Sequence, residues 1–203
     1  VDYHGAGRSA SRYQPQSDAD LAQLNSKQMV SNDCNLVTGY APLSKIESIV
    51  LNVENYINGK EFKVNHPYTG WDVKVIGYRM IDKYTLILNI PMIASLIENE
   101  EMYFKRKRGI YGDIVEYISR FSENVNVVIN PQDQNKKYYL TVLGSVADTG
   151  DVGVVGRGNR INGLITPMSS MCIEAPAGKN PMDHTGKIYG LLVHRLAEEI
   201  YKK

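Results

Sequence analysis

Residues that could hold an anion and its counterion are concentrated in residues 147–160, which read ADTGDVGVVGRGNR. Glycines let a backbone approach a ligand closely and direct its N–H groups at an anion. Arg157 and Arg160 carry guanidinium groups, which match the oxygens of a phosphate. Asp148 and Asp151 carry the hard oxygens that Mg²⁺ prefers beside a polyphosphate. The stretch has neither a Walker A nor a GxGxxG pattern, so a phosphate-binding loop and a glycine-rich surface turn both remain open.

A second candidate lies in residues 175–189, which read APAGKNPMDHTGKIY. Asn180 is a suitable N-cap and Pro181 a suitable first residue of a helix, and the N–H groups at a helix start suit phosphate. Basic side chains lie around this predicted start, namely Lys179, His184 and Lys187, the last about two turns inside the helix. Taken alone, a well-capped helix with solvated lysines is the more common explanation. The two candidate regions flank a predicted strand, 161–166, so both could converge on one extended anion.

Two weaker candidates lie nearer the N-terminus. Residues 31–42, SNDCNLVTGYAP, place Asp33 ahead of an apolar run, where it either faces a ligand or forms an ordinary Asx turn. Residues 4–11 contain the sequence Gly-Ala-Gly-Arg, which carries little information alone. The basic run 105–108 follows three glutamates and is explained by a solvated helix face.

Hydrophobic periodicity predicts the elements that would position these residues. The clearest helix, 43–59, starts with the capping box of Ser44 and Glu47 and has Gly59 as its C-cap. The further predicted elements are a hairpin of strands 71–79 and 84–90 turning at 82–83, a helix 100–121, a strand pair 125–129 and 138–146, and a last helix 181–201. This order predicts an α+β fold, with helices on one face of mixed, largely antiparallel sheets.

Composition excludes several classes of protein. The 203 residues carry 23 Lys and Arg against 22 Asp and Glu, so no overall charge attracts nucleic acid or anionic lipid. The longest apolar runs are far shorter than the ~20 residues of a membrane span. Two cysteines, Cys34 and Cys172, form at most one disulfide, and reduced thiols in the cytoplasm are the simpler interpretation. The chain begins with Val1, so we expect a processed piece or a fragment.

Three sequence blocks in one order resemble the archaeal-type S-adenosylmethionine synthetase (methionine adenosyltransferase) family. They are residues 32–43 with ND and GYAPL, residues 150–167 with GRGNRINGLITP, and residues 177–189 with AGKNP and GKIY. The resemblance covers residues 30–203 and, more loosely, residues 1–30. It implies a fold of three similar α+β units per subunit, and homodimers whose active sites are shared between the subunits.

The resemblance also implies a reaction in which the sulfur of methionine attacks C5′ of ATP, followed by hydrolysis of the released tripolyphosphate to pyrophosphate and phosphate. It implies Mg²⁺ as the cofactor, with K⁺ as an optional second ion, and no nucleic-acid or membrane partner. Asp151 matches the metal-binding carboxylate, and Asp33 matches a carboxylate on the methionine and adenosine side. Catalytic roles fall to Arg157, Lys179 and His184. The implied ATP- and polyphosphate-binding residues are Gly5, Gly7, Ser9, Gly156, Arg157, Asn159, Arg160, Lys179, Asn180 and Lys187.

Departures from the family lead us to expect a central fragment that is inactive alone. Family members are about twice this length, their N-terminal His-Pro-Asp motif is not found, and Val152 replaces a second acidic residue common after Asp151. The expected organisation is a remnant of a preceding domain in 1–30, a central α+β domain in 31–147 and the start of a C-terminal α+β domain in 148–203. The alternative is a non-catalytic subunit that binds polyphosphate or nucleotide. An RNA-binding module is disfavoured by the balanced charge.

Overall fold

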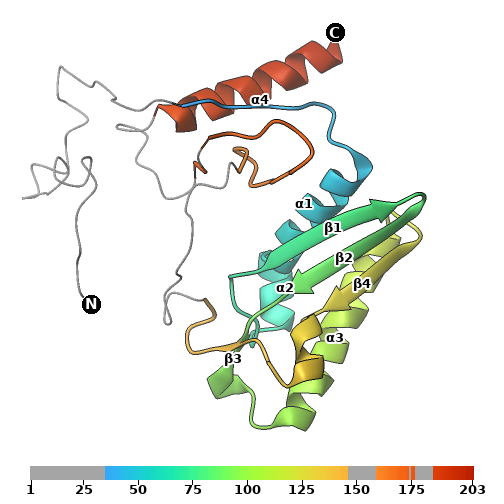
Figure 1. Cartoon of the computed structure of the whole chain (residues 1–203). Coiled ribbons are helices and arrows are strands. Elements are labelled where there is room, and N and C mark those ends of the chain that lie inside the picture. Colours follow the sequence, from blue (N-terminus) through green and yellow to red (C-terminus); the bar gives the residue numbers. More distant parts are fainter. Residues whose placement is uncertain (1–34, 146–158, 174, 177–184) are drawn as a thin grey trace, which may run out of the picture. The chain divides into compact units, whose positions relative to one another are not determined.

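The structure, a computed structural model, describes residues 35–145, 159–173, 175–176 and 185–203. The chain divides into two compact units. One is Leu43–Gly153, and the other combines Val1–Pro42 with Val154–Lys203. Figure 1 labels the elements of both, and its mixture of helices and strands confirms the α+β class. The domain boundaries expected after residues 30 and 147 stay a prediction.

The first helix begins at the predicted capping box. Ahead of α1 (Lys45–Ile57), the Ser44 side chain accepts a hydrogen bond from the backbone N–H of Glu47, and the Glu47 carboxylate accepts one from Ser44 N at 2.8 Å. We predicted Gly59 as the C-cap of this helix, but the C-cap is Asn58. Gly59 has an ordinary φ of −71° and instead precedes a second helix, α2 (Lys60–Asn65). A helix of this length has no periodic signal of its own, which is why it was not predicted.

Three strands form the main sheet, in the order β1-β2-β4. β1 (Lys74–Met80) and β2 (Lys83–Asn89) form the predicted antiparallel hairpin. Its turn is at Ile81 and Asp82, one residue earlier than predicted, and Ile81 adopts a φ of 55°. β4 (Val125–Ile129) lies on the other side of β2 and runs parallel to it.

The long helix α3 (Glu100–Ser119) provides the crossover that two parallel strands need. Its N-cap Asn99 accepts a hydrogen bond from Met102 N at 2.8 Å. α1 packs on β1, α3 packs on β4, and the two helices contact each other, so they cover one face of the sheet, as predicted (Figure 1). The core between helices and sheet includes Ile49, Val53, Ile57, Leu86, Leu88, Ile110 and Ile114.

Gly77 in the middle of β1 allows α1 to lie close to the sheet. A Cβ atom at this position would lie 2.5 Å from Val50 Cγ2 and 2.8 Å from Ile46 Cδ1, far inside van der Waals distance. Among the described residues of this unit, no helix lies on the opposite face of the sheet (Figure 1). We call it the open sheet face; its side chains are Ile76, Tyr78, Met80, Thr85 and Ile87.

The predicted second hairpin is wrong. After β4 the chain forms a short 3₁₀ turn, η3 (Pro131–Asn135), and β5 is limited to Leu140–Thr141. β5 pairs in parallel with β3 (Met92–Ile93), which precedes the 3₁₀ turn η2 (Ala94–Leu96), and not with β4. Pairing β4 with β2 places its buried residues beside the buried leucines of β2 and under α3. A hairpin with the polar segment after residue 131 would not bury them in this way.

The described part of the second unit contains one helix, α4 (Gly186–Lys202). It corresponds to the predicted last helix, whose expected start at 181–184 lies outside the described residues. The predicted strand 161–166 is wrong, because these residues form a tight turn instead.

Candidate functional site

The candidate site residues fall into two groups. Asn159, Arg160 and Lys187 lie in the described part of the chain, all in the second unit. Outside the described residues lie Gly5, Gly7, Ser9, Asp33, Asp151, Gly156, Arg157, Lys179, Asn180 and His184. Their roles stay predictions.

Residues 159–166 form a compact turn closed by backbone hydrogen bonds. Arg160 N donates to Leu164 O at 2.9 Å, and Gly163 N donates to Arg160 O at 2.8 Å. Gly163 adopts a φ of +89°, which glycine tolerates and other residues rarely do. Asn159 closes the turn from outside, with its Nδ2 donating to Gly163 O at 3.1 Å. The Asn-Gly pair at 162–163 was the sequence signal for this turn, and it outweighs the apolar residues that suggested a strand.

Arg160 lies inside this unit with 2% of its surface exposed. Its guanidinium Nη2 donates to Thr166 Oγ1 at 2.8 Å, and its Cζ lies 4.8 Å from the centre of the Tyr40 ring. These contacts join the two ends of the turn to each other and join Arg160 to the segment 35–42. Arg160 thus holds the turn together, and the proposed contact with polyphosphate is better suited to Arg157, three residues earlier in the sequence.

The segment 35–42 packs along residues 170–173 in the same unit. Ile173 N donates to Leu36 O at 3.0 Å, and the Tyr40 hydroxyl donates to Ser170 O at 2.8 Å. Thr38 N donates to the thiol sulfur of Cys172 at 3.4 Å. The first block of the family resemblance is therefore in direct contact with the residues that connect the second and third blocks.

The start of α4 contacts the same segment. A Cβ atom added at Gly186 would lie 1.9 Å from Asn35 Nδ2, so any larger residue would displace the Asn35 side chain. Asn35 follows Asp33 by two residues, and Gly186 follows His184 by two residues. Thr185, the N-cap of α4, makes no side-chain capping hydrogen bond. Lys187 is half-buried in the first turn of α4, whereas we predicted it about two turns inside the helix.

The first unit contains a buried histidine, His66, that the sequence analysis did not identify as a candidate site residue. His66 Nε2 lies 2.7 Å from Asp113 Oδ2, and His66 Nδ1 lies 2.6 Å from the Tyr68 hydroxyl. A neutral ring with its proton on Nε2 satisfies both contacts, because Asp113 then accepts and Tyr68 donates. Burial raises the pKa of the Tyr68 phenol, in keeping with its role as a donor. His66 and Asp113 lie 47 positions apart in the sequence, and no sequence pattern predicted this contact.

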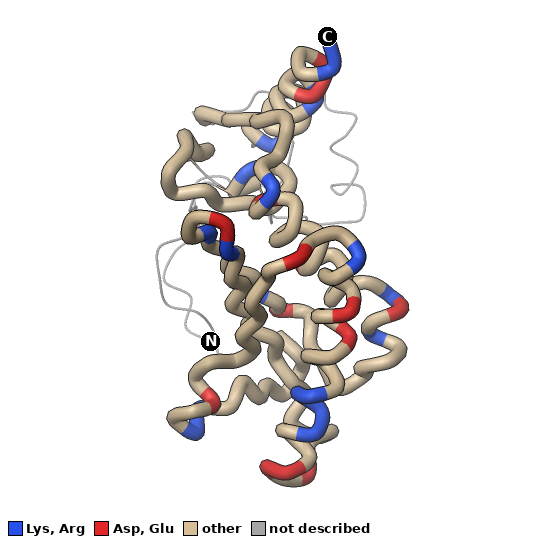
Figure 2. The backbone as a smooth tube through the Cα atoms, turned by 90° about the vertical axis from the view of Figure 1, so that its right-hand side faces the viewer, with Lys and Arg blue, Asp and Glu red and all other residues tan. Residues whose placement is uncertain are grey.

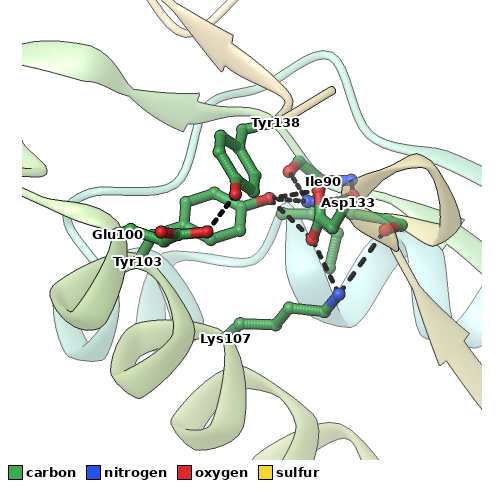
Figure 3. A network of polar contacts seen from close by, with 7 residues as sticks. Ile90, Glu100, Tyr103, Lys107, Asp133 and Tyr138 are labelled. Atoms are coloured by element: carbon green, nitrogen blue, oxygen red, sulfur yellow. Dashed lines mark hydrogen bonds and ion pairs between the residues drawn. The ribbon is translucent and has the colours of Figure 1, made fainter. Parts of the chain in front are cut away.

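A second buried network joins α3 to the turn η3 (Figure 3). Tyr103 donates its hydroxyl hydrogen to the Asp133 carboxylate at 3.0 Å, and Lys107 Nζ lies 2.7 Å from Asp133 Oδ2. Asn130 Nδ2 donates to the Tyr103 oxygen at 2.9 Å. The Asn130 side chain also accepts from Ile90 N at 2.8 Å and donates to Ile90 O at 2.9 Å. Burial raises the pKa of the Tyr103 phenol, so it remains a donor.

The first unit also contains a cavity of about 400 Å³ beside this network. Its lining residues come from β1, the end of β2, the segment after β4 and the approach to β5: Lys74, Asn89, Asn130, Gln132, Lys137, Tyr138 and Tyr139. Sequence reasoning missed the cavity because its lining residues are dispersed over four segments.

Other site types were sought in the described ranges. There, no group of three His, Cys, Asp or Glu side chains is arranged to hold a metal ion, and Asp151 lies outside those ranges. No helix described here is long and apolar enough to cross a membrane. Basic and acidic residues are interspersed along the described backbone (Figure 2).

Comparison with known proteins supports the family resemblance. The family model for S-adenosylmethionine synthetase matches residues 14–203. An S-adenosylmethionine synthase of Thermococcus onnurineus is 44% identical over 174 residues, covering 84% of this chain and 43% of the relative. The synthase of Pyrobaculum islandicum is 40% identical over 178 residues, covering 86% and 44%. That of Thermoplasma acidophilum is 40% identical over 197 residues, covering 93% and 48%.

The chain spans about half the length of the curated relatives it matches. The matched region includes the turn at 159–166, the segment 35–42 that packs against it, and the start of α4. On the strength of a family model that matches nearly the whole sequence, this chain belongs to the S-adenosylmethionine synthetase family.

Proposed function

We propose that the chain is part of a methionine adenosyltransferase, which forms S-adenosylmethionine from ATP and methionine. The observation that carries this proposal is the family match over residues 14–203. In the reaction, a lone pair on the methionine sulfur forms a bond to C5′ of ATP, and the bond from C5′ to O5′ breaks. O5′ leaves with the tripolyphosphate, which water then cleaves to pyrophosphate and phosphate.

This chemistry needs positive charge around the leaving group more than it needs acid–base groups, because the thioether sulfur is already nucleophilic. We assign that charge to Arg157 and Lys179, with His184 and Lys187 along the same polyphosphate. Support comes from Lys187, which lies in the first turn of α4, where the helix N–H groups favour an anion. The remaining proposed ATP contacts are Gly5, Gly7, Ser9, Gly156, Asn159 and Asn180; Arg160 is left out because its guanidinium is buried against Tyr40 and Thr166.

We place Asp33 on the methionine and adenosine side of the site. The contact between Asn35 and Gly186 supports this arrangement, because it brings the segment that follows Asp33 against the start of α4. Mg²⁺ would be held by Asp151, whose carboxylate is the donor type it prefers, and would neutralise charge on the polyphosphate. K⁺ is a second ion that we propose on the basis of family membership.

We further propose a homodimer and the repeated α+β units of the family fold. The open sheet face supports a dimer, because Ile76 is 54% exposed and Met80 is 68% exposed on a regular sheet surface. We place the enzyme in the cytoplasm; the free thiol of buried Cys172 supports a reducing compartment.

The experiment is to incubate the full-length enzyme that contains this chain with ATP, methionine and Mg²⁺ and to follow S-adenosylmethionine by chromatography. We expect product in the wild type, and a loss of at least about tenfold in activity in Lys179→Ala, which removes a charged hydrogen bond to phosphate. This chain assayed alone should form no product. The matched control is Lys202→Ala at the other end of α4, which should keep wild-type activity. Binding of tripolyphosphate without turnover would instead favour the non-catalytic subunit.

A further inference from the structure

The cavity in the first unit lies where the two parallel strands end. Lys74 pairs with Asn89 at one end of the hairpin, and Asn130 directly follows β4, which runs parallel to β2. The carboxyl ends of parallel strands are a common place for ligands, because the chain leaves the sheet there and opens a crevice. The volume of about 400 Å³ is within the usual range for small-molecule pockets.

The walls of the cavity are held in place by internal contacts. Asn130 is fixed by its three side-chain hydrogen bonds to Ile90 and Tyr103. On the other wall, the Tyr139 hydroxyl donates to Asp72 Oδ2 at 2.5 Å, and Lys74 Nζ lies 2.5 Å from the same oxygen. Although burial alone would raise the pKa of Asp72, hydrogen bonds from Lys74 and Tyr139 lower it. The pocket is therefore largely formed before any ligand arrives, which reduces the entropy lost on binding.

Several lining groups are available to a ligand. In the described ranges, neither the Lys137 ammonium nor the Asn89 amide has a hydrogen-bond or ion-pair partner. Lys74 uses two of its three donors, on Asp72 and Tyr139. The rings of Tyr138 and Tyr139 also line the cavity. Ammonium groups bind anions, amides form hydrogen bonds with the polar edge of a ring, and tyrosine rings stack against a planar ring.

We propose that this cavity binds a small organic anion that carries a planar ring, with the anionic group on Lys137 and Lys74 and the ring against Tyr138 and Tyr139. A nucleoside monophosphate has this chemistry. The site lies within the first unit, whereas Arg157, Lys179 and Lys187 belong to the second. It is thus separate from the proposed reaction, and its occupancy does not depend on that proposal.

The test is calorimetric titration of the purified protein with AMP, without methionine or Mg²⁺. Lys137→Gln should weaken AMP binding about three- to tenfold, the effect of one partly solvated charge contact. Lys136→Gln is the matched control, because this neighbour does not line the cavity and should bind AMP like the wild type. Adenosine lacks the anion and ribose 5-phosphate lacks the ring, so both should bind more weakly than AMP.

Tripolyphosphate titrations separate this site from the proposed polyphosphate site. Lys137→Gln should leave tripolyphosphate affinity unchanged, and Lys179→Ala should leave AMP affinity unchanged. No AMP binding in the wild type, or equal AMP affinity in the wild type and Lys137→Gln, would overturn the proposal. AMP binding that is lost in Lys179→Ala but kept in Lys137→Gln would also overturn it, since AMP would then occupy the polyphosphate site.

Discussion

Replacing Lys107 by methionine tests the buried network between α3 and η3. The Lys107 side chain is 23% exposed, whereas the Asp133 side chain that it contacts at 2.7 Å is 3% exposed. Methionine keeps the apolar stem of the lysine and removes its charge. Asp133 would then remain a buried carboxylate with only the Tyr103 hydroxyl as a donor. Losing one partner of a buried ion pair costs about 3–5 kcal/mol, and we expect the lower end because Lys107 is partly exposed.

The opposite substitution should be milder. In Asp133→Asn the amide oxygen still accepts from Tyr103, and the Lys107 ammonium can turn towards water, so we expect a loss of about 1–2 kcal/mol. The double variant Lys107→Met/Asp133→Asn should be more stable than Lys107→Met alone, because it leaves no buried charge unpaired. We therefore expect the loss of the lysine to destabilise the protein more than the loss of the carboxylate, because only the first leaves a buried charge without its partner.

The free energy of unfolding, measured by urea titration with circular dichroism, checks this reasoning. Lys105→Met on the exposed side of the same helix is the control and should change stability by less than about 0.5 kcal/mol. Our account would be refuted if Lys107→Met were as stable as Lys105→Met. It would also fail if Asp133→Asn were more damaging than Lys107→Met.

Three further predictions concern pH, packing and metal. Burial lowers the pKa of Lys63 to about 8, against 10.5 in the unfolded chain, with Glu54 opposing the shift. The unfolded state therefore binds more protons than the folded state between these two pKa values, and the free energy of unfolding should rise with pH across this window. We expect a rise on the order of 1 kcal/mol, because solvent screens the half-buried ammonium group. In urea titrations, Lys63→Met should abolish this rise. Gly77→Ala should destabilise by about 1–3 kcal/mol, and adding Val50→Ala should restore part of the melting temperature. Asp151→Asn should raise the Mg²⁺ concentration for half-maximal nucleotide binding, and equal Mg²⁺ dependence in the variant and the wild type would contradict a metal-binding role for Asp151.

The elements that the sequence predicts correctly are those with a local signal. α1 has its capping box at Ser44, and the hairpin has alternating residues on two adjoining runs. α3 has isoleucines at helical spacing and a capping residue at its start. Each signal is contained within one segment, so no knowledge of the rest of the fold is needed to interpret it.

Strand partners and side-chain clusters could not be predicted in this way. The alternation of β4 identifies it as a strand, but the choice between β2 and the following segment depends on how α3 covers the sheet. The contact between His66 and Asp113 and the cavity at Lys137 likewise join segments with no shared pattern. At residues 161–166 a local signal was available in Asn162-Gly163, and the prediction gave more weight to the apolar neighbours.

The described contacts around the candidate site are mostly uncharged. Thr38 and Tyr40 hold their segment through a backbone carbonyl and a thiol, and Gly186 holds its position through close packing against Asn35. Arg160 is the exception, and its guanidinium is directed at Tyr40 and Thr166. A cation that holds the fold together cannot move to a polyphosphate without breaking its anchor. Because Arg160 already serves as an anchor, we assign the polyphosphate to residues beside the anchors and not to Arg160.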